Sequence, residues 1–437
     1  MEFFKKLQYK NQKENIFLNK NTPKISLPPS ASNFTVNFLA LAVGLAILAI
    51  LQWWWPFSTF RNGVIACIVI ATIISAYDLF VAKVWQRDSA GLVGLKPRKA
   101  SLQRVLVKLV GLAFSLAVPT LAYLIFPEYQ DTFYQPWWEV LKIIGIPLLI
   151  LSPIYFWWID GLQRDPYDDY WHLGAVFCCL ENPDWNRIAH HWGGWIIKGF
   201  FLPSMFCYLV GVNANLETAI HSFKSMEVKH WLSVYTFFYH WLYLVDIMVA
   251  VIGYTMSLRI LDAHTRTVQP TTLGWLVTLI CYAPFNLILD KLLPYQTDHW
   301  GWGPWLHNHP YIQIIWGLMI LSMITIHVLS ILTLGLRFSN LTNRGIVTDG
   351  LFKYSKHPDY ICKSISWWLI WVPFIPINNP WMAVRNCMLL AVLNFIYYMR
   401  AVTEERHLNE DPIYRAYAAW IAEYGLFARL KRLLFIK

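Results

Sequence analysis

Two polar segments near the end of the sequence hold most of the residues whose types suit chemistry. The first, GLRFSNLTNRGIVTDGLFKYSKHPDY over residues 335–360, combines a glycine turn at Gly350, clustered aromatic rings, basic side chains and His357 directly before Pro358. A residue that precedes a proline is kept out of the α-helical region. We therefore expect His357 to be held in an extended conformation, just before the next apolar stretch begins.

The second segment is NFIYYMRAVTEERHLNEDPIYRAY, residues 394–417. Arg400 and Glu404 are four residues apart, so on one continuous helix they share a face, and Glu405 lies on the adjacent face. Carboxylates at the mouth of a membrane helix are costly unless water or a cation matches them. The spacing indicates a candidate site, although an ordinary ion pair on a solvated helix end would have the same spacing.

The composition indicates the setting in which these segments must work. The chain has 437 residues, of which 57% are hydrophobic and 14% are charged. Soluble domains carry about 25% charged residues, so an ordinary soluble protein is excluded, as are disordered and fibrous classes. The 24 Trp and 23 Tyr residues suit a membrane–water interface. We expect membrane lipids as partners and no nucleic acid, because the net charge of +10 is spread over loops and tails.

Long apolar runs predict the elements that position the two segments. A bilayer core requires about 20 apolar residues for each helix. The sequence therefore predicts an all-α polytopic integral membrane protein with about ten transmembrane helices, the last two forming a hairpin. The predicted spans are 34–54, 63–85, 104–127, 137–159, 194–212, 230–260, 271–293, 311–336, 361–377 and 381–403.

Basic residues in the connecting loops predict the orientation. Lys and Arg gather in both tails and in the loops after the second, sixth and eighth spans, whereas 128–136, 294–310 and 376–380 contain neither. By the positive-inside rule, both termini are cytoplasmic. We therefore expect a multi-pass protein of a bacterial inner membrane or an endomembrane, with the candidate site facing the cytoplasm.

Taken in order, the two polar segments resemble the isoprenylcysteine carboxyl methyltransferase family, whose wider group includes phospholipid methyltransferases. The resemblance covers roughly 311–437 and lies in GIVTDGLFKYSKHPDY, the apolar hairpin, R-x-x-x-E-E-x-x-L and Y-x-x-Y. It implies that this region binds S-adenosylmethionine in a cytosolic pocket, while a lipophilic acceptor enters from the membrane. The implied catalytic residues are Arg400, Glu404 and Glu405, and the implied cofactor-binding residues are Gly350, Tyr354, Lys356, His357, Pro358, Tyr360, Glu404 and Glu405.

The chemistry of the implied donor suits these residue types. A glutamate can pair with its ammonium, and Lys356 or His357 can hold its carboxylate. Aromatic faces can stabilise its sulfonium by about 0.5–2 kcal/mol each. Arg400 can orient an acceptor carboxylate by two hydrogen bonds. Transfer to an amine or a hydroxyl needs a proton acceptor, for which Glu404, Glu405 and His357 are candidates.

Two other functions remain open. Sterol reductases also have about ten spans and a similar His-Pro-x-Tyr-like motif, and they reduce a C=C bond with NADPH. Asp246 lies deep in a predicted span, where it is a candidate proton donor, although a polar contact with His240 or Tyr243 would also explain it. The Arg-Asp-Glu-x-x-Cys and Val-Pro-Tyr-Arg patterns of those enzymes are absent from the last helix and the tail. The third possibility is a non-catalytic lipid-binding membrane protein.

The remaining polar residues and the domain organisation complete the expectations. His190 and His191, with nearby histidine and acidic residues, match no zinc spacing, so no metal site is expected. Asp78 and His327 lie inside spans, where we expect hydrogen bonds between helices. The oligomeric state and the role of the first six spans are not predicted. The expected division is a cytoplasmic tail 1–33, a transmembrane domain 34–270 with a cytoplasmic loop 160–193, and a methyltransferase module 271–437.

Overall fold

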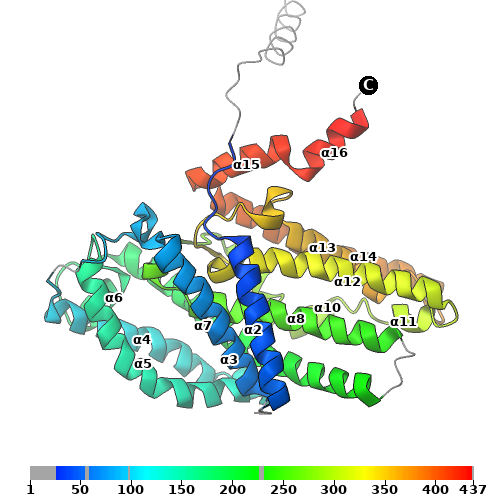
Figure 1. The fold of residues 1–437 in the computed structure, drawn as a ribbon, viewed down its shortest axis with the longest axis horizontal. Helices are drawn as coiled ribbons and strands as arrows, with labels where there is room; N and C mark the ends of the chain where they lie inside the picture. The colour runs from blue at the N-terminus through cyan, green and yellow to red at the C-terminus, as the bar shows by residue number, and fades with distance from the viewer. Residues whose placement is uncertain (1–25, 55–58, 97–98, 226–230, 436–437) are drawn as a thin grey trace, which may run out of the picture.

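The protein is almost wholly helical in a computed structural model (Figure 1). The two strands found among the described residues, β1 (Thr267–Val268) and β2 (Thr342–Asn343), pair antiparallel. This confirms the predicted all-α fold, whereas most of the predicted tail 1–33 lies outside the described residues. The structure describes residues 26–54, 59–96, 99–225 and 231–435.

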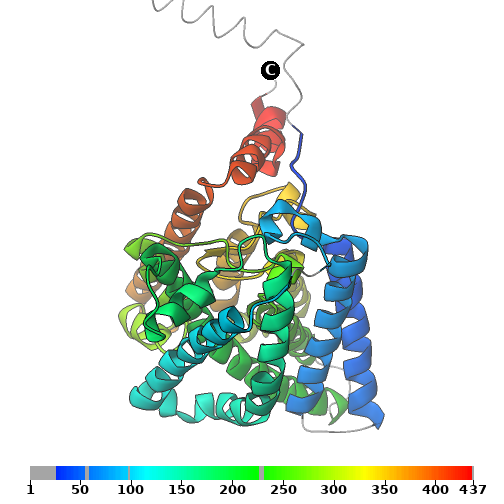
Figure 2. The same ribbon diagram turned by 90° about the vertical axis from the view of Figure 1, so that its left-hand side faces the viewer.

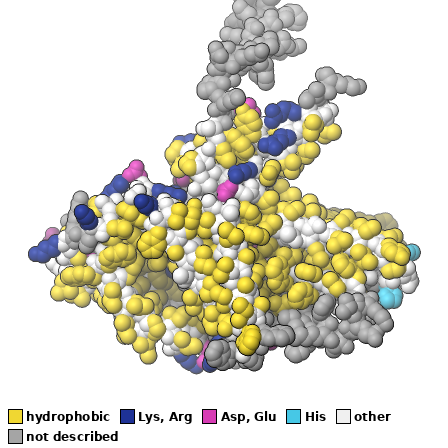
Figure 3. Space-filling model, viewed as in Figure 1, with side chains coloured by type: hydrophobic (Ala, Val, Ile, Leu, Met, Phe, Trp, Pro, Cys, Tyr) yellow, Lys and Arg dark blue, Asp and Glu magenta, His cyan; other side chains and the backbone are white. Residues whose placement is uncertain are grey.

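In the described part of the chain, eight helices are long and apolar enough to cross a membrane. Figure 3 shows apolar side chains over the broad face of the bundle, while charged side chains gather along one edge and on the projecting C-terminal helices. The protein is therefore a polytopic integral membrane protein. The eight helices are α2 (Phe34–Trp54), α3 (Thr59–Ala76), α4 (Leu102–Ile125), α5 (Gln135–Leu162), α7 (Trp185–Ser225), α8 (Trp231–Thr255), α12 (Pro310–Leu334) and α14 (Pro380–Leu408).

Two of the ten predicted spans are not long helices. The run 271–293 is divided into α9 and α10 around Pro284, which has no backbone N–H to donate to a helix. The run 361–377 is helical only in α13, which ends before Pro373, with Val372 in a left-handed conformation. The shorter helices are α6 (Asp169–Phe177), α9 (Thr272–Leu279), α10 (Asn286–Leu292), α11 (Trp302–Trp305), α13 (Pro358–Trp371), α15 (Pro412–Tyr424) and α16 (Leu426–Phe435).

The chain nevertheless crosses the bundle at both of these places. At one end, β1 pairs with β2, and the Thr267 hydroxyl lies 2.9 Å from Nε2 of His407. At the other end, near α11, His299 forms a bridge with Pro376. The chain therefore passes between the two ends four times, through α9–α10, α12, α13 and α14. Figure 2 shows that α15 and α16 project beyond the bundle, beside the residues that precede α2.

The predicted cytoplasmic loop 160–193 is partly helical. It contains the end of α5, all of α6 and the start of α7. Helix α6 packs directly on α4 through two glycines: a Cβ on Gly174 would collide with the Val107 carbonyl oxygen, and a Cβ on Gly111 with that of Tyr170. This backbone-to-backbone contact fixes α6 against a membrane helix.

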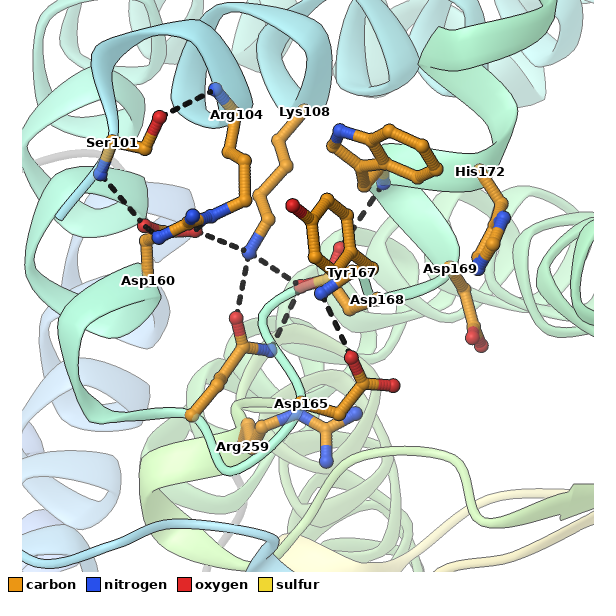
Figure 4. A network of polar contacts seen from close by, with 12 residues as sticks. Ser101, Arg104, Lys108, Asp160, Asp165, Tyr167, Asp168, Asp169, His172 and Arg259 are labelled. Atoms are coloured by element: carbon orange, nitrogen blue, oxygen red, sulfur yellow. Dashed lines mark hydrogen bonds and ion pairs between the residues drawn. The ribbon is translucent and has the colours of Figure 1, made fainter. Parts of the chain in front are cut away.

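A buried charge network holds the same helices together (Figure 4). Lys108 of α4 is 0% exposed. Its Nζ lies 3.1 Å from Oδ1 of Asp160 and 3.3 Å from Oδ2 of Asp168, and it donates to Oε1 of Gln163 at 2.6 Å. Arg104 adds an ion pair of 2.8 Å with Asp160. Each charge in this network therefore has partners, which is the condition for burying it at low cost.

A second buried ion pair joins the first spans to the C-terminal part. Asp78, in the π-helix η1 (Tyr77–Val81) that follows α3, pairs with Nη1 of Arg337. Nη2 of Arg337 donates to the Leu261 carbonyl oxygen at 3.0 Å. The sequence expectation of a polar contact for Asp78 between helices is confirmed, and its partner is a cation at the end of α12.

The α4–α6 contact gives the first prediction. The substitution Gly174→Ala is expected to lower the free energy of unfolding by about 1–3 kcal/mol, because overpacking forces the two backbones apart. Gly145→Ala in α5 is the matched control, since no atom lies within 4 Å of its added Cβ. Thermal unfolding in detergent measures both variants. Equal midpoints for Gly174→Ala and the wild type would contradict the close packing.

Candidate functional site

A cavity of about 400 Å³ lies between α8, α12, α13 and α14. Five of the residues predicted from the two polar segments line it, which brings the two segments together in space. Residues 338–342, near β2, form another part of its wall. The five predicted residues are Lys356, His357, Tyr360, Arg400 and Glu404.

A groove of about 810 Å³ runs on the other side of the same residues, between α13 and α14. Glu405 lines the groove and not the cavity, whereas Glu404 lines the cavity and not the groove. The inference that Glu404 shares a face with Arg400, and that Glu405 lies on the adjacent face, is therefore confirmed. Lys356, His357 and Tyr360 line both spaces and form the wall between them.

Glu405 is neutralised within the protein. Lys356 forms an ion pair with its Oε2, and Nε2 of His357 lies 3.1 Å from its Oε1. Burial lowers the pKa of the His357 imidazole, but the hydrogen bond with Glu405 and the nearby negative charges of Glu404 and Asp359 outweigh burial, so the pKa lies above its ordinary value. His357 is outside the helical region, as expected before a proline, but with φ −135° and ψ 61° it is not in the extended conformation that we predicted.

Glu404 has a different environment, because it forms no ion pair with any described residue. The Tyr360 hydroxyl donates to Oε2 of Glu404 at 3.0 Å. The Tyr360 ring stacks on His357, with ring centres 5.4 Å apart and planes 2° from parallel. Glu404 therefore presents a carboxylate to the cavity that a ligand cation can reach.

Arg400 is a buried cation that forms no ion pair within 4 Å with any described residue. It is 3% exposed, and its guanidinium lies over the rings of Tyr397, Tyr360 and Tyr282 at 4.7, 5.1 and 5.5 Å. Its Nη2 donates to Oδ1 of Asn340 at 3.3 Å and to the Tyr282 hydroxyl at 3.4 Å, while Nε and Nη1 have no partner. A buried charge left unpaired is strongly destabilising. The arrangement suits the binding of an anion.

Three further residues of the predicted site do not line the cavity. Gly350 lies away from both spaces in a left-handed conformation with φ +54°, where a Cβ would approach the Thr333 hydroxyl to 2.6 Å. Pro358 begins α13 and lines neither space. Tyr354 lines the groove, and the Arg429 guanidinium lies over its ring at 6.0 Å. Gly350 and Pro358 thus shape the backbone that presents the site.

Sequence reasoning missed several lining residues. Tyr282 comes from the break between α9 and α10, outside the two polar segments, whereas Asn340 lies within the first segment, before β2, but was not among the predicted site residues. No local spacing relates them to Arg400. Asp246 and His327 attracted attention separately as polar residues in spans, but the structure places them together in the cavity. The alternative explanation for Asp246, a hydrogen bond or ion pair with His240 or Tyr243, is not found among the described residues, and the ion-pair partner of Asp246 is His327.

The histidines near α6 belong to a polar network. Nδ1 of His190 lies 2.9 Å from Oδ2 of Asp169, and Arg187 bridges Asp169 and Asp165. Burial raises the pKa of the Asp169 carboxyl, but hydrogen bonds from His190 and Arg187 outweigh it and lower the pKa to about 2. Among the described residues, no group of three or more His, Cys, Asp or Glu side chains is arranged to hold a metal ion.

Comparison with known proteins identifies one region. Residues 310–421 match a family model described as a protein of unknown function (DUF1295). The match extends over α12, α13, α14 and most of α15, and so includes both polar segments. No curated protein matches the chain. No solved structure matches it either.

The raised pKa of His357 gives the second prediction. A group whose pKa is raised by folding stabilises the fold below its ordinary value, about 6.5 for histidine, and loses that contribution as the pH rises through the raised value. We expect the unfolding temperature of the wild type to be higher than that of His357→Gln. The difference should be largest at about pH 6 and smallest at about pH 9. Thermal unfolding across this pH range measures the difference. His307→Gln, an exposed histidine near α11, is the control. An advantage of the wild type that grows with pH would contradict the Glu405 interaction.

Proposed function

We propose that this protein transfers a methyl group from S-adenosylmethionine to a lipophilic acceptor. The observation that carries the proposal is a pair of opposite charges, Arg400 and Glu404, on one face of the cavity, neither of which forms an ion pair within 4 Å with a described residue. Four residues of helix place them about 6 Å apart along α14. That spacing suits a zwitterion such as the amino-acid end of the donor, whose ammonium would meet Glu404 and whose carboxylate would meet Arg400.

The residues around this pair fit the donor. The unpartnered Nε and Nη1 of Arg400 are buried donors, which an anionic ligand would satisfy. The rings of Tyr282, Tyr360 and Tyr397 face the same space and would attract a sulfonium cation. Methyl transfer is the chemistry that the donor supplies; these side chains would bind it, orient it and keep water away. Lys356 and His357, which we expected to hold the donor carboxylate, are instead paired with Glu405.

The groove supplies a route for a lipophilic acceptor. Its wall includes apolar side chains that are exposed on the membrane-spanning part of the bundle, such as Ile361, Ile365 and Tyr398. An acyl or isoprenoid chain could lie there while its polar end reaches the wall formed by Lys356, His357 and Tyr360. An acceptor carboxylate is the alternative ligand for Arg400. The proposed site lies near the β1–β2 end, and we propose that this end faces the cytoplasm.

One observation favours the reductase as a second candidate. Asp246 and His327 lie in the cavity, where a proton donor for a C=C bond would be needed, and Lys363 lines the same space. NADPH would have to place its phosphates near the β1–β2 end. The two candidates differ in the ligand that the purified protein binds. A non-catalytic lipid-binding protein would bind neither S-adenosylmethionine nor NADPH.

The third prediction tests the donor site by calorimetry. The purified protein is expected to bind S-adenosylmethionine and its demethylated product, S-adenosylhomocysteine. Glu404→Gln is expected to weaken this binding by about tenfold to a hundredfold, because a hydrogen bond to a charged group contributes about 1.5–3 kcal/mol. Arg400→Gln is expected to weaken it by a similar factor. Glu423→Gln, an exposed carboxylate on α15, is the control and should bind as the wild type does.

The same titration separates the candidates. Binding of NADPH without binding of either sulfur compound would replace the methyltransferase by the reductase. Binding of none of the three ligands, by a protein whose unfolding temperature is unchanged by them, would leave the lipid-binding protein.

A further inference from the structure

The cavity continues beyond Arg400 to a second group of charged side chains. Asp246 of α8, His327 of α12 and Lys363 of α13 line it together. Asp246 lies nine residues before the end of α8 at Thr255, which is about 14 Å at 1.5 Å per residue. His327 lies seven residues before the end of α12 at Leu334, which is about 10 Å. This group therefore lies well inside the membrane-spanning part of the bundle, where a charged side chain is costly.

The contacts of this group are incomplete. Nε2 of His327 lies 3.6 Å from Oδ2 of Asp246, within ion-pair range but beyond a hydrogen bond. His327 is 5% exposed, and neither of its ring nitrogens has a hydrogen-bond partner. The Lys363 ammonium lies over the rings of Trp367 and Tyr397 at 5.8 and 5.7 Å. The His327 side chain therefore belongs to the cavity wall, and its buried ring nitrogens lack a hydrogen bond, which costs free energy unless a ligand supplies one.

The buried charges around Lys108 are paired more completely than Asp246 and His327. The Lys108 ammonium has three partners within 3.3 Å, and Asp160 has two cations. Charges that only stabilise a fold are expected to be fully paired in this way. None of the residues of this network lines the cavity or the groove. Asp246 and His327 differ from this network in two ways. They are loosely paired, and they line the same cavity as the residues of the proposed donor site.

We infer that Asp246 and His327 hold and deprotonate the reacting group of the acceptor, which is a hydroxyl or a protonated amine and not a carboxylate. The inference rests on the proposed methyl transfer. A carboxylate is already ionised and needs no base, whereas a hydroxyl or an ammonium must lose a proton. Asp246 and His327 supply a base at a place where water is excluded, together with the charge that balances it.

The proposed methyl transfer begins with deprotonation of the acceptor. The acceptor proton passes to a ring nitrogen of His327, and the Asp246 carboxylate balances the imidazolium charge. The freed lone pair on the acceptor oxygen or nitrogen forms a bond to the methyl carbon of S-adenosylmethionine. The methyl–sulfur bond breaks, its electrons stay on sulfur, and the sulfonium becomes a neutral thioether. Arg400 is then left to bind the donor carboxylate, because the acceptor brings no carboxylate of its own.

The fourth prediction follows from the stability of the product. The full-length protein is placed in vesicles of total lipid extracted from the cells that express it, with methyl-labelled S-adenosylmethionine. Extracted lipid is then treated with mild alkali, which releases the methyl of an ester as methanol and leaves a methyl ether or methylamine intact. We expect the label to stay bound to oxygen or nitrogen, in the lipid or in a headgroup that alkali frees from its acyl chains, and none to appear as methanol.

Variants test the two side chains. Asp246→Asn and His327→Gln are each expected to lower the transfer rate by about a hundredfold or more, the usual contribution of a general base. Their affinity for S-adenosylhomocysteine should stay within about twofold of the wild type, since the donor site involves other residues; this titration also shows that the variants are folded. Asp290→Asn, an exposed carboxylate on α10, is the control and should transfer at the wild-type rate.

Three results would overturn the inference. Label released as methanol would identify a carboxylate acceptor and leave the proposed methyl transfer standing. A folded Asp246→Asn or His327→Gln protein that transfers at the wild-type rate would remove the base and also leave methyl transfer standing. A wild-type protein that neither binds S-adenosylhomocysteine nor labels lipid would remove the proposed function, and the inference with it.

Discussion

The free-energy cost of burying a charge inside a membrane bundle governs this structure. Lys108 is matched by carboxylates from α5 and from the N-terminal end of α6, and Arg337 is matched by Asp78 and a backbone carbonyl. Each match joins segments that are distant in the sequence, so the need for a partner also specifies which helices meet. Arg400 departs from this pattern. Its guanidinium is surrounded by aromatic rings and forms no ion pair with a described residue, and this missing ion pair marks the candidate site.

Two segments that are not long helices help to line the cavity. Backbone that is not helical is tolerated at membrane depth only where protein buries it or where it lines a polar space. The break between α9 and α10 brings Tyr282 to the cavity, and the segment that follows α12 brings Asn340. The Tyr282 hydroxyl and Oδ1 of Asn340 both accept hydrogen bonds from Nη2 of Arg400. A regular ten-helix bundle would have filled this volume with side chains.

Much of the site could be predicted from local sequence, and the rest depends on contacts that local sequence does not encode. Helical spacing alone places Arg400 and Glu404 on one face, and the proline after His357 predicts its non-helical backbone. The pairing of Lys356 and His357 with Glu405 requires the fold, because α13 and α14 must first meet. The meeting of Asp246 with His327 likewise joins two residues that are 81 positions apart in the sequence, on α8 and α12. Pro284 and Pro373 were readable signals that two apolar runs were too interrupted to be single helices.

Lys356, His357 and Tyr360 form one wall between the cavity and the groove. For a protein that handles one water-soluble and one lipid-soluble ligand, such a partition separates their paths of exit. The spent water-soluble ligand would leave past the β1–β2 end, and the modified lipid would move sideways between α13 and α14. Neither would have to wait for the other, so the order of product release would be random rather than compulsory.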